Sequence, residues 1–113
     1  MEHSSDLKLA ILHLDEVFNN EKGGVKNTLN LLHIRLLQFL EVLKANDLPT
    51  IKYEAHAIKS ELAFCGFNHL ADKVREIEAR AAEHILDQEM ILQFTALASK
   101  NIYEIGNWLL KEE

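Results

Sequence analysis

The chain has 113 residues, a length that suits one domain with one hydrophobic core, so we predict a single domain over residues 1–113. Hydrophobic residues make up 48% of the chain and charged residues 27%, a balance that predicts a packed interior and excludes a disordered tail. With 18 acidic residues against 12 lysines and arginines, the net charge is -6 and no dense basic cluster occurs, so we do not expect nucleic acid as a partner.

The N-terminal segment MEHSSDLKLAILHLDE contains a short apolar stretch that Lys8, His13 and Asp15 interrupt. It is too short to cross a bilayer and does not resemble a cleaved signal peptide. The single cysteine, Cys65, cannot form an internal disulfide, which favours a reducing compartment. We therefore expect a cytoplasmic domain without direct membrane contact, which either stands alone or forms the cytoplasmic end of a longer membrane-bound protein.

The sequence predicts an all-α protein. Pro49 is the only proline, and Val, Ile and Thr form no sustained alternating run that would indicate a strand. Residues 15–18 are typical of a short first helix, which we expect Gly23 and Gly24 to end.

A long second helix follows, with apolar residues at steps of three and four. These residues are Leu29, Leu32, Leu36, Phe39 and Leu43. Leu31, Leu37 and Leu40 are expected to widen this apolar face, as in a central helix of a bundle.

A third helix is predicted to begin near residue 48, because Asn46 and Asp47 offer side-chain acceptors and Pro49 suits a first turn. Its apolar stripe comprises Leu48, Ile51, Ala55, Ile58, Leu62 and Cys65. Gly66 stands where a helix end needs a residue that tolerates positive φ.

Two more helices complete the prediction. Asn68 is expected to cap the fourth, and Asp87 the fifth. Their apolar stripes are Leu70, Val74, Ile77 and Ala81, then Ile91, Phe94, Ala98, Ile102, Ile105 and Leu109. Because the loops are short, neighbouring helices should be antiparallel, which predicts an up-down four-helix bundle with the short N-terminal helix across one end.

The third helix carries the candidate functional residue, His56, on the face opposite its apolar stripe. Residues three, four or seven positions away should surround it there: Lys52, Tyr53, Lys59, Ser60 and Ala63. An exposed imidazole with small neighbours can attack phosphorus on another protein, and a lysine one turn away can stabilise the negative charge of the phosphoryl group. We assign that second role to Lys59, and Lys52 adds to the local potential.

Residues 55–67, AHAIKSELAFCGF, resemble the signature of the histidine-containing phosphotransfer (HPt) domain family. Counted from the histidine, an aliphatic residue stands two positions later, a lysine three, a small residue four and a glycine ten positions later. The resemblance implies a helical bundle that relays phosphoryl groups between receiver-domain aspartates, with His56 as phosphoacceptor, Lys59 as charge partner and Gly66 as structural turn. Lys52, Tyr53, Ser60 and Ala63 would form the docking surface.

The resemblance also implies the partners, which are receiver domains of response regulators, a hybrid sensor histidine kinase, or both. The receiver would supply Mg²⁺, so the chain needs no cofactor of its own. Two positions depart from the family pattern: Ser60 stands where glycine is usual, and Leu62 where Ser or Ala is usual. Ser60 still leaves room for a partner, whereas Leu62 belongs to the buried stripe.

Other functions remain open or are disfavoured. A helical adaptor that binds a receiver or kinase without carrying phosphate is the alternative, whereas the lack of a glycine-rich phosphate loop argues against autonomous kinase activity. No His-x-x-x-His or Glu-x-x-His spacing occurs, so we expect no metal site at the other histidines, His3, His13, His33, His69 and His84. We interpret Cys65 as a core residue and expect a monomer.

Overall fold

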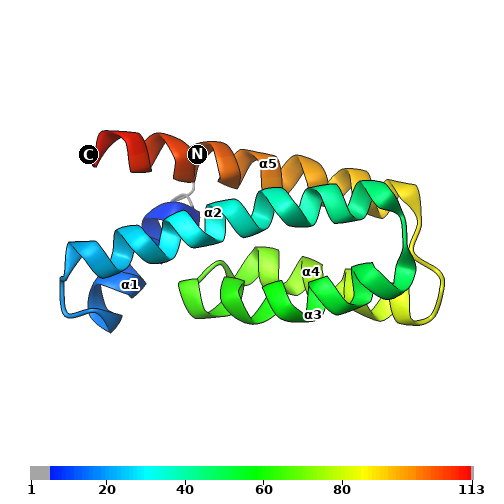
Figure 1. Cartoon of the computed structure of the whole chain (residues 1–113). Coiled ribbons are helices and arrows are strands. Elements are labelled where there is room, and N and C mark those ends of the chain that lie inside the picture. Colours follow the sequence, from blue (N-terminus) through cyan, green and yellow to red (C-terminus); the bar gives the residue numbers. More distant parts are fainter. Residues whose placement is uncertain (1–5, 113) are drawn as a thin grey trace, which may run out of the picture.

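Five helices and no strand make up residues 6–112, which are the residues that the computed structural model describes. The helices are α1 (Asp6–Val17), α2 (Lys22–Ala45), α3 (Leu48–Cys65), α4 (Asn68–Ala82) and α5 (Gln88–Lys111) (Figure 1). The predicted all-α fold class is confirmed. His3 lies outside the described residues. Among the described helices, none is long and apolar enough to cross a membrane.

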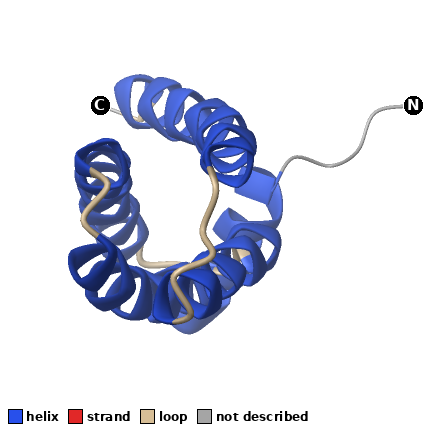
Figure 2. Cartoon of the chain, turned by 90° about the vertical axis from the view of Figure 1, so that its right-hand side faces the viewer, coloured by secondary structure: helices blue, strands red, loops and turns tan. Residues whose placement is uncertain are grey.

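The helices from α2 to α5 run up and down and form a ring. Each contacts the helix before and after it, and α5 closes the ring on α2 (Figures 1 and 2). The short α1 contacts α2, α3 and α5 at one end of the bundle. There, Nε2 of His13 donates a hydrogen bond to the carbonyl of Phe64 at 3.0 Å, which ties α1 to the last turn of α3.

Three of the predicted helix ends are confirmed. Asp47 accepts a hydrogen bond from the Thr50 amide at 3.2 Å, and Asp87 accepts one from the Met90 amide at 2.9 Å, so both aspartates cap the helices that follow them. Gly66 ends α3 with a φ of 90°, in the left-handed region that favours glycine. These ends fix where α3 begins and stops.

The prediction that Gly23 and Gly24 end the first helix is wrong. Both glycines lie in the first turn of α2, and the preceding turn instead contains Asn19 and Asn20 with φ of 52° and 66°. Asparagine tolerates this left-handed conformation better than most residues. Gly24 serves packing, because a Cβ there would lie 2.6 Å from Cδ1 of Phe18.

Two further expectations need correction. Phe67, not Asn68, occupies the N-cap of α4, because the connection from α3 is so short that Phe67 must fill this position while its ring is fully buried. Leu31 and Leu37 are exposed rather than part of the apolar face, since only one side of α2 packs on its neighbours. Leu40 is half-buried.

The core follows the predicted stripes. All the residues predicted for α4 are buried, and the main stripes of α2, α3 and α5 are buried except that Leu48 and Leu109 are half-buried. Phe39 of α2 and Phe94 of α5 meet edge to face with ring centroids 5.7 Å apart, which links two helices that are far apart in the chain.

Candidate functional site

The site is built on the α3–α4 hairpin. Only Gly66 and Phe67 separate these helices, and they form the most extensively contacting helix pair in the bundle. In such a tight antiparallel pair, residues at similar distances before and after the turn lie side by side. His56 on α3 therefore comes to lie beside Glu78 on α4.

His56 points outward, as predicted, with 71% of its side chain exposed. Its Nδ1 lies 2.9 Å from Oε2 of Glu78. An ionised carboxylate can only accept a hydrogen bond, so Nδ1 carries the proton and donates it. In a neutral imidazole with this tautomer, the other ring nitrogen, Nε2, carries a lone pair that is available to an electrophile.

Glu78 also binds Lys59. The Nζ of Lys59 donates to Oε1 of Glu78 at 2.7 Å, while 25% of the lysine side chain and 19% of the glutamate side chain are exposed. The hydrogen bond from Lys59 and that from His56 lower the pKa of Glu78 below its usual value, although partial burial acts in the opposite direction. One carboxylate thus links His56 and Lys59.

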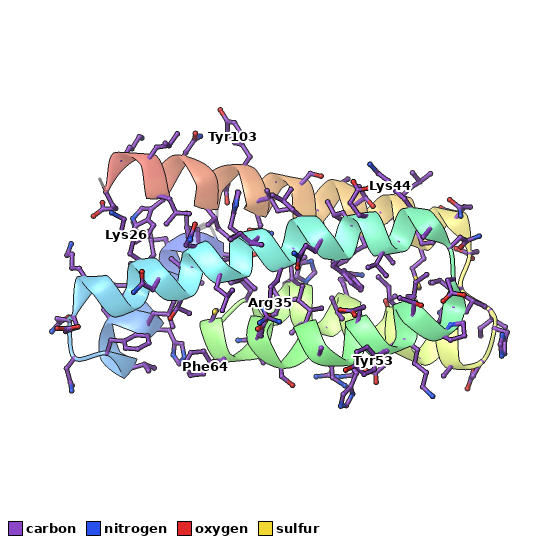
Figure 3. The ribbon with its side chains drawn as sticks, in the orientation of Figure 1. Lys26, Arg35, Lys44, Tyr53, Phe64 and Tyr103 are labelled. Atoms are coloured by element: carbon purple, nitrogen blue, oxygen red, sulfur yellow. The ribbon has the colours of Figure 1, made fainter. Side chains whose placement is uncertain are left out.

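The remaining predicted site residues lie around His56 without forming a closed pocket. Lys52, Tyr53, Ser60 and Ala63 are all exposed on α3, and Figure 3 shows Tyr53 pointing away from the bundle. This arrangement leaves an open surface that another protein can approach. Gly66 lies at the end of the helix and contributes only to the turn.

The sequence analysis did not identify Glu78 as a residue of the site. The length of the α3–α4 connection was the usable signal, because a turn at Gly66 and Phe67 places Glu78 opposite His56. That inference needs the register of two packed helices, which helical periodicity within one segment does not give.

Cys65 fits its interpretation as a core residue. Its side chain is buried, and burial together with the nearby Glu61 carboxylate raises the pKa of the thiol to about 11. The thiolate, which is the nucleophilic form, is therefore scarce near neutral pH. Cys65 does not compete with His56 as a reactive group.

Comparison with models of protein families matches residues 26–104 to the Hpt domain. The match covers α2, α3 and α4 almost completely and most of α5, and it includes His56, Lys59 and Glu78. No curated protein and no solved structure gave a significant match to the chain.

Proposed function

Because the chain belongs to the Hpt domain family, we propose that His56 takes up a phosphoryl group from a receiver-domain aspartate and passes it to another. Hpt domains act in histidine phosphotransfer and interact with receiver domains. The finer assignment to His56 depends on one observation above all: an exposed imidazole whose Nδ1 is held by Glu78 and whose Nε2 is free to react.

The transfer step follows from this geometry. The Nε2 lone pair attacks the phosphorus of the partner's aspartyl phosphate, the P–O bond to the aspartate breaks, and the aspartate leaves as a carboxylate. The ring gains positive charge as the N–P bond forms, and the Glu78 carboxylate offsets that charge through Nδ1–H. Donation to a second receiver reverses these steps.

Lys59 balances the negative charge that the phosphoryl group brings. An ammonium group has three N–H donors, and the bond to Glu78 uses one of them. The others can turn toward phosphoryl oxygens, while Lys52 adds positive potential nearby. Mg²⁺ and the acidic pocket come from the receiver in this proposal, so the domain acts as a cytoplasmic monomer without a cofactor or kinase activity of its own.

The decisive experiment mixes the chain with a phosphorylated receiver domain and follows acid-labile, alkali-stable label. Wild-type protein should acquire label, and His56→Gln should not, while its helicity and melting temperature stay unchanged. His69→Gln is a matched control, since His69 is also exposed but lies on α4, and it should be labelled like wild type. Binding of the receiver without any transfer would contradict the proposal and favour the adaptor function instead.

A further inference from the structure

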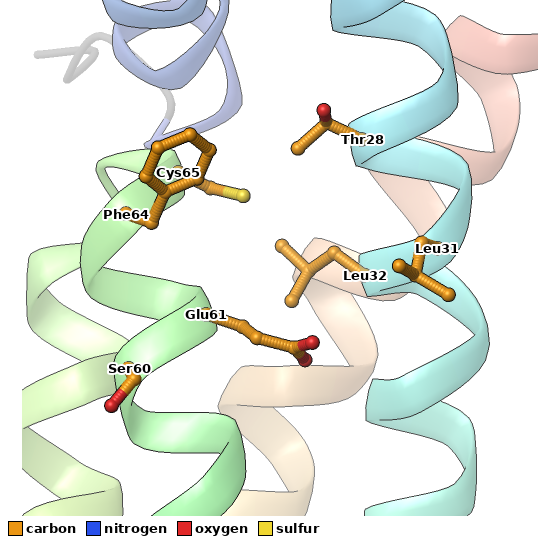
Figure 4. Close-up of a pocket in the computed structure, with 7 residues that line it drawn as sticks. All are labelled: Thr28, Leu31, Leu32, Ser60, Glu61, Phe64 and Cys65. Atoms are coloured by element: carbon orange, nitrogen blue, oxygen red, sulfur yellow. The ribbon is translucent and has the colours of Figure 1, made fainter.

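A groove of about 330 Å³ lies between α2 and α3. Thr28, Leu31 and Leu32 of α2 face Glu61, Phe64 and Cys65 of α3 across it (Figure 4). Leu31 and Phe64 are large apolar side chains that remain about half exposed. The groove is thus wide enough for one long side chain and mostly apolar along its walls.

One polar group inside the groove lacks a partner. Oε2 of Glu61 pairs with Nε of Arg35 at 3.0 Å, but Oε1 is enclosed and accepts no hydrogen bond from any described residue. Leaving a buried carboxylate oxygen unpaired is unfavourable, and burial raises the pKa of Glu61 although Arg35 opposes this effect. A positive charge in the groove would lie beside this carboxylate and offset the penalty.

The groove is continuous with the His56 surface. Ser60 lines the groove and also follows His56 by one helical turn on the exposed face of α3. A protein that brings an aspartyl phosphate to Nε2 of His56 and also lies over Ser60 would reach the groove. The groove can therefore bind a side chain of that protein.

Given His56 as the phosphoacceptor of the proposed function, we propose that this groove binds a lysine or arginine side chain of the receiver domain, with the cationic tip beside the Glu61 carboxylate. The aliphatic stem lies between Leu31 and Phe64, as such stems do on apolar surfaces. A cation offsets the burial of a carboxylate better than a neutral donor. The net charge of -6 also favours a basic partner surface.

The test compares two phosphodonors. A phosphorylated receiver domain must dock, whereas phosphoramidate is small and reports the chemistry of His56 without docking. For Glu61→Gln, we expect kcat/KM with the phosphorylated receiver to fall about tenfold, which is equivalent to about 1.4 kcal/mol. The loss should come from a higher KM. The rate of labelling by phosphoramidate should stay as in wild type. Glu54→Gln is the matched control, because it removes the same charge from the same helix outside the groove, and it should behave like wild type.

A second variant tests occupancy of the groove itself. Thr28→Phe fills it from α2 and should also lower transfer from the receiver, whereas Thr95→Phe, at another half-buried threonine on α5, should not. Unchanged receiver kinetics in either Glu61→Gln or Thr28→Phe would overturn the groove assignment. Failure of wild-type protein to be labelled at His56 by either donor would overturn the proposed function instead, so the two results are distinguishable.

Discussion

Glu78 gives the two nitrogens of His56 different environments. Nδ1 faces a carboxylate that is itself held by Lys59, while most of the His56 side chain is exposed to solvent. A histidine on a helix surface without such a partner has no fixed tautomer or ring orientation. The hydrogen bond from Nδ1 therefore turns an ordinary exposed residue into an oriented nucleophile, much as carboxylates orient metal-binding histidines.

The lowered pKa of Glu78 predicts how stability depends on pH. An acid whose pKa is lower in the folded state stabilises that state above its usual pKa, and the contribution disappears as the pH falls through the lowered value. Glu78→Gln should therefore lower the free energy of unfolding at pH 7 by up to about 1 kcal/mol. In urea titrations over a series of pH values, the difference from wild type should vanish at strongly acidic pH.

Glu76→Gln is the control for that experiment, since Glu76 is exposed on the same helix and has no hydrogen bond to His56 or Lys59. The free energy of unfolding of Glu76→Gln should equal that of wild type at every pH in the series. Equal, pH-independent losses in both variants would mean that the Glu78 network adds nothing to stability.

Much of the site is visible in the sequence at the level of single residues. The exposure of His56, the proximity of Lys59 and the turn at Gly66 all follow from periodicity within one helix. Glu78 and the unpaired oxygen of Glu61 do not, because both depend on how α3 packs against another helix. The role of His56 as phosphoacceptor stays a prediction until label is measured.

Helix ends could be predicted where a residue type at that place in the sequence indicates only one kind of local structure. Asp47 and Asp87 cap helices because their carboxylates can reach free amides two or three residues on. The glycine pair was misassigned because glycine marks either a helix end or a close contact, and only packing against Phe18 distinguishes the two. Asn68 failed as a cap because Phe67 already fills that position.

The glycine pair offers a matched test of this packing. A Cβ at Gly23 meets nothing within 4 Å, so Gly23→Ala should stabilise α2 by about 0.5 kcal/mol through helix propensity. At Gly24 the same change would press on the Phe18 ring. We expect Gly24→Ala to be at least about 1 kcal/mol less stable than Gly23→Ala in urea denaturation. Equal stabilities would show that Phe18 moves aside without penalty.

At the scale of the whole molecule, α1 lies outside the residues that match the Hpt domain, yet it packs as part of the bundle. Ala10 and Leu14 are fully buried, and His13 bonds to the end of α3. The groove opens beside that same turn of α3, since Phe64 lines it. Helix α1 therefore holds the turn of α3 that lines the proposed docking groove, although the family match begins after it.

This packing predicts that α1 unfolds together with the rest of the chain. Leu14→Ala removes a fully buried side chain and should lower the free energy of unfolding by about 3 kcal/mol, whereas Leu12→Ala, on the exposed side of α1, should change it by less than about 0.5 kcal/mol. Trp108 fluorescence and helical circular dichroism should report one coincident urea transition in both variants, as expected for a single domain. Two separate transitions, or a Leu14→Ala variant as stable as Leu12→Ala, would mean that α1 is an appendage whose loss leaves the four-helix ring intact.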